Sequence, residues 1–494
     1  MPLRPVTPYQ RITRNLGSTL FTIGVGLSLG GISLASPLWV AAGTLSLALG
    51  FVARDASGSG WHSVTPMTIY AFATALSCVA NITGLLAADS DRRQLYFLYA
   101  YEEHLMLAML LTLAGLLIPI LAFRAVLALR LEQSAGGVLP RVHGVVSDLA
   151  LLRWGLLLGI LVIGMRVVMP LTGLGTISAL IWLLPQLLVF ALARRGVMIA
   201  DRRMIFAALG LAVIEAARAL MFDFLRGDII APIIAFAIGT ILGARSFRVL
   251  RTSYFLPIYA VTGLFIVYFG LFGAERSRMS VGVARIEQLV ELSEVEQMGA
   301  YGPVEQRQTV LSRLTTFNQL TQIARIVDED GYLDGETLEY LGYAFIPRII
   351  WPEKPKIAKG AWFALRIGQA RLAESGYITN SVNMTIPGEL YLNYGWLGVV
   401  AGLGIFGWLL AILWDRAAFW RATSNTLGSA FGYYLLWVGL TMAADLQIVV
   451  TLVAMYLLFI GAGWLLRLFS APVPPGRRPI ASPRHAGEAV ARPS

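Results

Sequence analysis

The stretch with the most concentrated charge is residues 345–360, read as FIPRIIWPEKPKIAKG. It holds every lysine of the chain, Lys354, Lys356 and Lys359, together with Arg348. Its three prolines remove backbone donors and fix φ, so the stretch suits neither a helix interior nor a central strand. We therefore predict a rigid loop that gathers cationic groups in one place. Such cations suit a negatively charged ligand, because arginine offers a planar fork to phosphate oxygens and lysine a compact positive charge.

A second stretch with candidate catalytic residues follows at residues 383–396, read as NMTIPGELYLNYGW. Glu389 stands just before a long apolar run, where it could act as a general base, with Tyr391 as its neighbour. A glutamate at a helix start is also stabilised by the helix dipole in any protein. The sequence therefore leaves a catalytic and a structural role of Glu389 equally open.

The composition places both stretches in a membrane protein. The 494-residue chain is 57% hydrophobic and only 14% charged, with a mean hydropathy of +0.68. Apolar runs of about 20 residues, long enough to cross a hydrocarbon core, recur along the sequence. We predict an all-α polytopic membrane protein with about 12 transmembrane helices. The predicted spans are 16–33, 38–52, 66–88, 104–127, 151–170, 174–193, 204–221, 229–243, 254–272, 390–414, 427–444 and 449–466.

Arginines in the short connections set the predicted orientation. An even number of spans puts both termini on one side, and most of these arginines, such as Arg124 and Arg203, fall on that side. By the positive-inside rule that side is cytoplasmic. Because these arginines account for much of the net charge of +10, nucleic acid is not an expected partner.

The predicted organisation has four parts. Residues 1–272 form a membrane bundle with spans one to nine, and residues 388–470 add spans ten to twelve. Between them, residues 273–387 form one large extracytoplasmic loop, which carries the cationic stretch. Residues 471–494 are rich in proline, arginine and small residues and bury too little apolar area to fold. We predict that they form a disordered cytoplasmic tail.

The loop contains one clear amphipathic pattern. Between residues 313 and 327, apolar side chains such as Phe317, Leu320 and Ile323 recur at helical intervals. This pattern predicts a helix that lies on the bundle or on the membrane surface. A covering helix is the simpler interpretation, and a substrate role is the alternative.

Ionisable residues also occur inside the predicted spans. Arg166 lies late in the fifth span, and Glu215 and Arg218 lie late in the seventh, so all three fall in the outer half of the membrane. Glu215 and Arg218 are three residues apart and can pair on one helix face. Intramembrane charges are costly and often functional. The structural alternative is a buried ion pair with an arginine that snorkels to the headgroups.

The outer loop adds further cations, namely Arg276, Arg278 and Arg313. The topology rule predicts few positive charges on this side, so they favour an anionic ligand. The alternative is that they pair with the acidic residues of the loop, since exposed ion pairs are common and weak.

The sequence lacks the residue patterns that usually bind a metal or a cofactor. Cys78 is the only cysteine, so no intrachain disulfide or cysteine pair can form. The sequence has no nucleotide-phosphate loop, no convincing metal motif and no cluster of histidines. We expect neither a metal nor a cofactor.

Four stretches together resemble a known family. Between residues 313 and 407 they read RLTTFNQL, GYLDGETLEYL, FIPRIIWPEKP and IPGELYLNYGWLGVVAGLGIFG. This pattern resembles the bacterial oligosaccharide repeat unit polymerases, the Wzy-like O-antigen and exopolysaccharide polymerases. The PR-x-x-WP-x-KP signature is its most specific part.

The resemblance implies a GT-C-like membrane glycosyltransferase. Such an enzyme moves a growing glycan from undecaprenyl diphosphate onto a second lipid-linked repeat unit. The reaction would take place at the outer face of the bacterial cytoplasmic (inner) membrane, without metal or cofactor. The implied partners besides the bilayer are a flippase and a chain-length regulator.

The resemblance and the residue chemistry together suggest roles. Loss of a lipid diphosphate leaving group builds up negative charge, which fixed cations stabilise better than water does. Arg348 and Lys354 match the family signature and are the expected catalytic residues together with Glu389. The expected substrate-binding residues are Arg313, Arg276, Arg278, Arg166, Arg218, Lys356 and Tyr391.

Two other functions fit the same features. A lipid-linked glycan ligase would share the topology and the cationic mouth but deliver the glycan to another acceptor. Related ligases are thought to use a loop histidine, and residues 273–387 contain none. A flippase or carrier is the alternative without catalysis, although alternating access favours a polar site near the midplane.

Overall fold

The computed structural model describes most of the membrane bundle and parts of the outer loop. The described residues are 8–56, 64–87, 101–134, 148–168, 176–219, 226–243, 315–344, 346, 350–355, 359–369, 382–422, 426–441 and 446–469. The predicted span at 254–272 and the predicted tail at 471–494 lie outside them.

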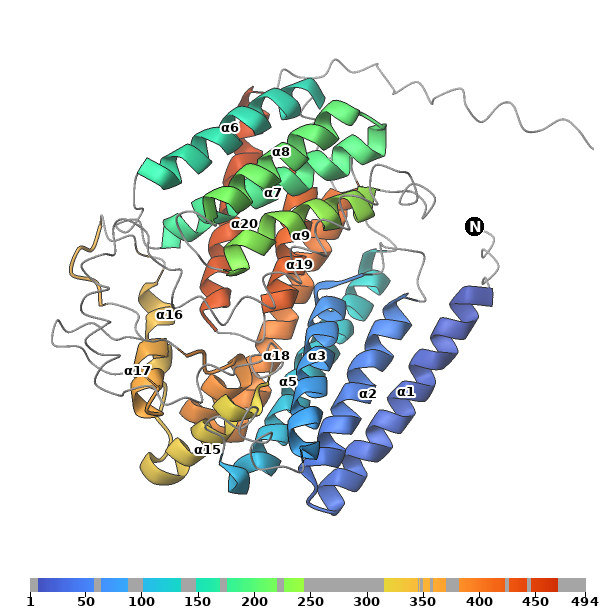
Figure 1. The fold of residues 1–494 in the computed structure, drawn as a ribbon, viewed down its shortest axis with the longest axis vertical. Helices are drawn as coiled ribbons and strands as arrows, with labels where there is room; N and C mark the ends of the chain where they lie inside the picture. The colour runs from blue at the N-terminus through green and yellow to red at the C-terminus, as the bar shows by residue number, and fades with distance from the viewer. Residues whose placement is uncertain are drawn as a thin grey trace, which may run out of the picture.

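Within these residues every regular element is a helix (Figure 1). Residues 1–272, the predicted first part of the bundle, contain α1 (Pro8–Ser33), α2 (Pro37–Ala56), α3 (Pro66–Leu86), η2 (Glu102–His104), α5 (Leu105–Ser134), α6 (Asp148–Val168), α7 (Thr176–Ile199), α8 (Arg202–Arg218) and α9 (Arg226–Gly243). Residues 273–387, the predicted outer loop, contain α15 (Phe317–Asp330), η7 (Glu336–Leu338), α16 (Tyr340–Tyr343) and α17 (Lys359–Arg366). The last part provides α18 (Ile386–Ala422), α19 (Thr426–Thr441) and α20 (Gln447–Phe469).

The helices support the predicted membrane class. Five stretches of the described chain are long and apolar enough to cross a membrane: Gln10–Ser33, Pro37–Ala56, Pro66–Leu86, Glu102–Leu129 and Ile386–Ala417. The protein is therefore a helical membrane protein, as predicted. Helices α6 to α9, α19 and α20 also coincide with predicted spans, but the total of about 12 stays a prediction.

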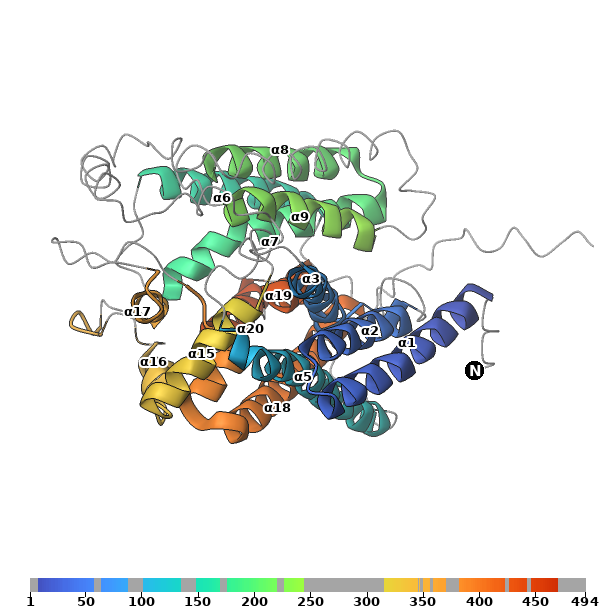
Figure 2. The same ribbon diagram turned by 60° about the horizontal axis from the view of Figure 1, so that its bottom comes forward.

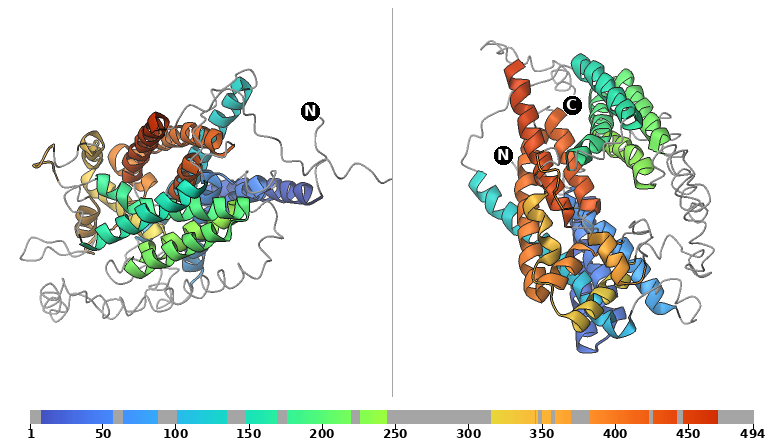
Figure 3. Two further views of the ribbon diagram at one scale, coloured as in Figure 1. Left: turned by 90° about the horizontal axis from the view of Figure 1, so that it is seen from above. Right: turned by 90° about the vertical axis from the view of Figure 1, so that its left-hand side faces the viewer.

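The helices form two groups (Figure 2). Helices α6 to α9 pack among themselves, whereas α1, α2, α3, α5 and α18 form the other group. Helix α19 connects the groups, because it packs against α3, α7 and α18, and it runs beside α18 and α20 (Figure 3). Helices α1 and α2 pack closely through glycines: a Cβ on Gly24 would lie 2.7 Å from the backbone nitrogen of Leu47. Small residues allow such close contacts between helices in membranes.

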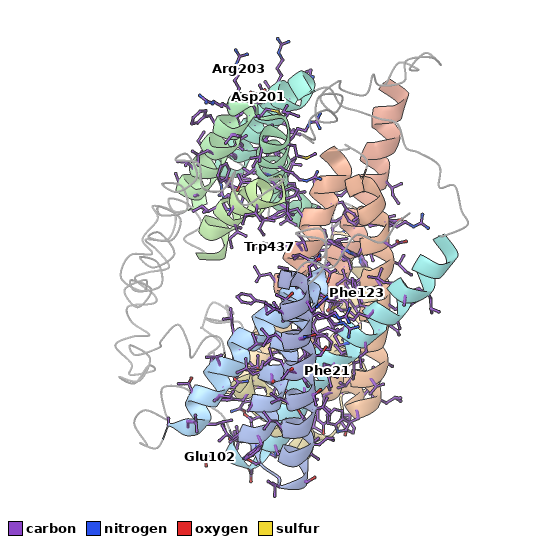
Figure 4. The ribbon with its side chains drawn as sticks, turned by 90° about the vertical axis from the view of Figure 1, so that its right-hand side faces the viewer. Phe21, Glu102, Phe123, Asp201, Arg203 and Trp437 are labelled. Atoms are coloured by element: carbon purple, nitrogen blue, oxygen red, sulfur yellow. The ribbon has the colours of Figure 1, made fainter. Side chains whose placement is uncertain are left out.

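The two predicted sides of the membrane correspond to opposite ends of the molecule. Glu102, predicted on the outer rim, and Arg203, predicted in a cytoplasmic connection, lie at opposite ends (Figure 4). Which end faces the cytoplasm stays a prediction.

Helix α15 lies on the bundle, which is one of the two positions predicted from its amphipathic pattern. It packs between α5 and α18, and its apolar side chains Phe317, Leu320 and Ile323 are buried. Polar side chains of its first turns are buried as well, including Asn318 and Thr321. The amphipathic pattern identified the apolar face correctly; protein also covers polar side chains of the first turns, whereas Asp328, Glu329 and Asp330 at the end of the helix are exposed.

The start of α15 lies deep in the bundle. The backbone N–H of Thr316 donates to Oδ1 of Asn81 at 3.2 Å, and Asn81 Nδ2 donates to Thr316 Oγ1 at 3.3 Å. Asn81 is fully buried in α3. Because backbone groups at membrane depth need internal partners, this asparagine allows a helix to begin inside the bundle.

Helix α18 contains a break where the outer loop docks. Tyr394 (φ −137°, ψ 16°) and Gly395 (φ 60°, ψ −148°) leave helical geometry. The turn after α15 packs on this break: Leu333 N–H donates to the Leu392 carbonyl at 3.0 Å, and the Tyr394 hydroxyl donates to the Asp334 carbonyl at 3.2 Å. The short helical segment before the break thus carries Glu389 into the bundle.

Candidate functional site

A buried ion pair lies at the start of α18. Lys359 Nζ donates to both carboxylate oxygens of Glu389, at 2.8 Å each. The side chains are 8% and 1% exposed. Lys359 Nζ also donates to the Tyr340 hydroxyl at 2.8 Å and lies 4.3 Å from the centre of the Tyr340 ring. Helix α17 therefore delivers a cation, and α16 an aromatic ring, to the carboxylate of α18.

A polar layer surrounds this pair. Asn393, one turn after Glu389 on α18, donates from Nδ2 to the Glu389 carbonyl and to Thr337 Oγ1, each at 2.7 Å. Its Oδ1 accepts from the Gly335 N–H at 3.1 Å. The Thr337 hydroxyl lies 3.5 Å from Glu389 Oε1. Since Glu389 and Asn393 are both almost fully buried, the layer orients the carboxylate away from bulk water.

This arrangement limits what Glu389 can do. A carboxylate bound by an ammonium is stabilised in its ionised form. To accept a proton from a substrate hydroxyl it must exchange the hydrogen bonds of Lys359 for those of the substrate. The role of general base remains a prediction, and the structure adds Lys359 as the ion-pair partner of Glu389.

Lys354 points into its own loop. Its Nζ donates to the carbonyls of Ala344 and Ile346, at 2.9 Å each, and it lies 5.8 Å from the centre of the Tyr343 ring. Tyr343 also packs edge to face against Trp351 with centroids 6.1 Å apart. The loop is therefore braced by a buried lysine as well as by prolines. This geometry favours a bracing role for Lys354, and its predicted catalytic role stays untested.

The intramembrane charges form a buried triad. Arg218 donates from Nε and Nη2 to the carboxylate of Glu215, at 3.0 Å each, which is the pairing predicted from their spacing. Arg166 of α6 donates from Nη1 to the same carboxylate. All three side chains are at most 3% exposed. The alternative in which Arg166 snorkels to the headgroups is therefore wrong for the described structure, because its guanidinium is buried on Glu215.

The structure does not bring the triad and the Lys359–Glu389 pair together. The triad belongs to the group of α6 to α9, whereas the pair belongs to the elements around α18 (Figure 2). Tyr391 lies near the pair but contacts other aromatic rings: Tyr332 at 6.0 Å and Trp396 at 5.9 Å between centroids. The remaining predicted residues, Arg348, Arg313, Arg276, Arg278 and Lys356, lie outside the described residues.

Sequence reasoning missed Lys359, Tyr340 and Asn393 as members of one site. Lys359 was visible as one of three clustered lysines, but nothing in the sequence shows which lysine meets Glu389. Asn393 lies four residues after Glu389, a spacing that places both on one helix face. That spacing is the one signal that could have found it.

Comparison with protein-family models, curated proteins and solved structures found no match to this chain. Among the described residues, no group of three or more His, Cys, Asp or Glu side chains is arranged to hold a metal ion.

Proposed function

We propose that the protein polymerises lipid-linked oligosaccharide repeat units into a surface polysaccharide at the outer face of the bacterial cytoplasmic membrane. The observation that supports this most is the meeting of the resembling stretches. Parts of three of the four lie around the start of α18: Thr316 and Asn318, Leu333 to Tyr340, and Glu389 to Asn393. Lys354, of the remaining stretch, bonds to the carbonyls of Ala344 and Ile346 just after α16. Stretches that are distant in the sequence therefore contribute residues to one site.

In the proposed reaction a carboxylate accepts a proton and cationic side chains stabilise negative charge. Lys359 positions the Glu389 carboxylate, which accepts the proton of the acceptor hydroxyl as that oxygen forms the new glycosidic bond and the bond from the donor sugar to its diphosphate breaks. Arg348, on the braced loop, stabilises the diphosphate that leaves the donor. The predicted role of Arg166 and Arg218 in holding a second diphosphate is not part of this step, because both guanidinium groups are buried on Glu215, away from the Lys359–Glu389 pair.

The test is complementation of a strain that lacks the gene. We expect the strain to accumulate single repeat units on the lipid carrier or on the lipid core, without long chains. Wild-type protein should restore long chains, and Arg348→Ala should fail although it inserts normally into the membrane. Arg203→Ala, at the other end of the molecule, is the matched control and should complement fully. Full complementation by Arg348→Ala would remove Arg348 from the site.

The ligase alternative predicts a different phenotype. Loss of a ligase leaves long polymer on the lipid carrier, because polymerisation precedes transfer. Loss of a flippase leaves single lipid-linked units on the cytoplasmic side of the membrane. Analysis of the lipid-linked glycans, with protease or enzyme access to each side, therefore separates the three functions.

A further inference from the structure

Helix α17 lies directly against the candidate site. It has eight residues and lies at the edge of the molecule, beside α16 (Figure 1). Lys359, Phe363 and Arg366 recur along it at intervals of four and three residues, so they share one face. Each of these three side chains contacts the rest of the protein, whereas Trp362 on another face is exposed. One face of a short helix therefore carries its main contacts.

An ion pair lies at each end of this face. At the start of α17, Lys359 Nζ lies 2.8 Å from both carboxylate oxygens of the buried Glu389. At its end, Arg366 Nη2 donates to Asp330 Oδ2 and lies 3.6 Å from Glu329 Oε2, both at the end of α15. The Arg366 side chain is 39% exposed, so water reaches this outer pair. Because exposed ion pairs contribute little stability, the end of α17 can detach from α15 at small cost.

Between these pairs a small apolar patch docks α17. Phe363 and Ala364 are fully buried and belong to the main hydrophobic core. The N–H of Val382 donates to the Gly360 carbonyl at 3.0 Å. No other helix of the described chain packs along the length of α17. The helix is therefore attached at a few points and is not enclosed by its neighbours.

The docked position of α17 closes the site. The Glu389 side chain is 1% exposed, and both of its oxygens accept from Lys359. Lys359 holds the carboxylate in place until a substrate hydroxyl replaces its hydrogen bonds. Because Lys359 is the first residue of α17, it leaves Glu389 when the start of α17 moves. Water then reaches the carboxylate, which is no longer a buried charge.

We propose that α17 is a lid over Glu389 and that a phosphate-bearing ligand opens it. Lys359 and Arg366 suit phosphate oxygens, and both are bound to carboxylates while the lid is closed. A ligand shifts a conformational equilibrium only through its preference for one state. Phosphate binds these two cations after they leave their carboxylates, so it favours the open state. The proposal rests on the proposed function, which supplies a lipid diphosphate and gives Glu389 its role.

The test measures the rate at which a maleimide labels a buried thiol on α17 in the purified protein. Cys78, the only cysteine of the chain, is buried and is first replaced by alanine. Ala364→Cys then places the reporter thiol at a fully buried position of α17. Inorganic diphosphate should speed its labelling about fivefold or more, the lower end of usual ligand-coupled changes. Sodium chloride at equal ionic strength should speed it less, because it screens the outer pair without binding both cations.

Variants of the outer pair are compared with matched controls. Asp330→Asn weakens the hold on Arg366 and should speed labelling about two- to fivefold, the effect of losing an exposed ion pair. Asp334→Asn makes the same change at an exposed aspartate that forms no ion pair within the described residues, and it should leave the rate unchanged. Ala324→Cys, equally buried in α15, should stay protected with and without diphosphate. If thermal unfolding shows that Ala364→Cys is not folded, Leu365→Cys is the reporter.

Three results would overturn the proposal. Protection of both α17 reporters, even in Asp330→Asn and with diphosphate, would show that α17 does not move. Equal effects of diphosphate and chloride would show screening without a phosphate ligand. Labelling of Ala324→Cys at the rate of Ala364→Cys would show that α15 opens together with α17. Because the assay needs no glycan, a lid that opens with diphosphate in a protein that forms no polymer refutes the proposed function alone, and polymer formation with protected reporters refutes the lid alone.

Discussion

The buried Lys359–Glu389 pair gives the sharpest prediction about stability. Both side chains are almost fully buried, so removal of one leaves the other charge without compensation. Removal of one partner of such a pair costs about 3–5 kcal/mol. We therefore expect Lys359→Met to lower the free energy of unfolding by about this amount. The double variant Lys359→Met with Glu389→Met has no buried charge and should recover most of the loss, because apolar pairs often replace buried ion pairs without penalty.

The assay is denaturant or thermal unfolding of the purified protein in detergent, with all four members of the double-mutant cycle compared. Glu329→Gln is the control. It removes an exposed partner of Arg325 and should change stability by about 0–1 kcal/mol. The reasoning fails if Lys359→Met is as stable as wild type. It also fails if the double variant loses the sum of the two single effects, since the cycle would then show no coupling between the residues.

Three further predictions concern the elements that hold the site. Gly395→Ala should destabilise by about 1–3 kcal/mol, because its backbone conformation is almost restricted to glycine, and its Cβ would lie 2.8 Å from the Tyr332 hydroxyl. Gly404→Ala, on the same helix in open space, should not destabilise, as unfolding in detergent can check. Asn81→Leu should cost about 1–3 kcal/mol by leaving buried polar groups at the start of α15 unsatisfied, and limited proteolysis should show that start exposed. Glu215→Gln should cost about 3–5 kcal/mol, because two buried guanidinium groups lose their carboxylate, and the purified variant should aggregate at lower temperature.

Local features of the sequence were sufficient for the local parts of the fold. The apolar runs predicted helices because a membrane requires backbone groups to be satisfied within each span. The Glu215–Arg218 pair was predictable because its members are three residues apart on one helix. Of the loop predicted at residues 345–360, residues 350–355 form no helix, as their prolines predicted, whereas α17 already begins at Lys359.

The remaining features depend on contacts between distant segments. An amphipathic pattern shows which face of α15 is apolar, but not that protein also buries polar side chains of its first turns, such as Asn318 and Thr321. Asn81 lies within an apolar run and gave no sign that it would satisfy a backbone N–H more than 230 residues later. The sequence also did not identify the ion-pair partner of Glu389. Three lysines lie within six residues, and only the docking of α17 selects Lys359.

The first turn of α18 lies inside the helix bundle. A Cβ on Gly115, ten residues after the start of α5, would lie 3.2 Å from Pro387, so the first turn of α18, which carries Glu389, packs about 15 Å along α5. At that depth an unpaired carboxylate is strongly unfavourable. Lys359 of α17 compensates this carboxylate, so the pair links the predicted loop to the bundle. Any motion of α17 that withdraws Lys359 leaves the Glu389 carboxylate without this cation. If Glu389 is the base of a glycosyl transfer, proton uptake and movement of α17 are then coupled, and substrate entry can drive both.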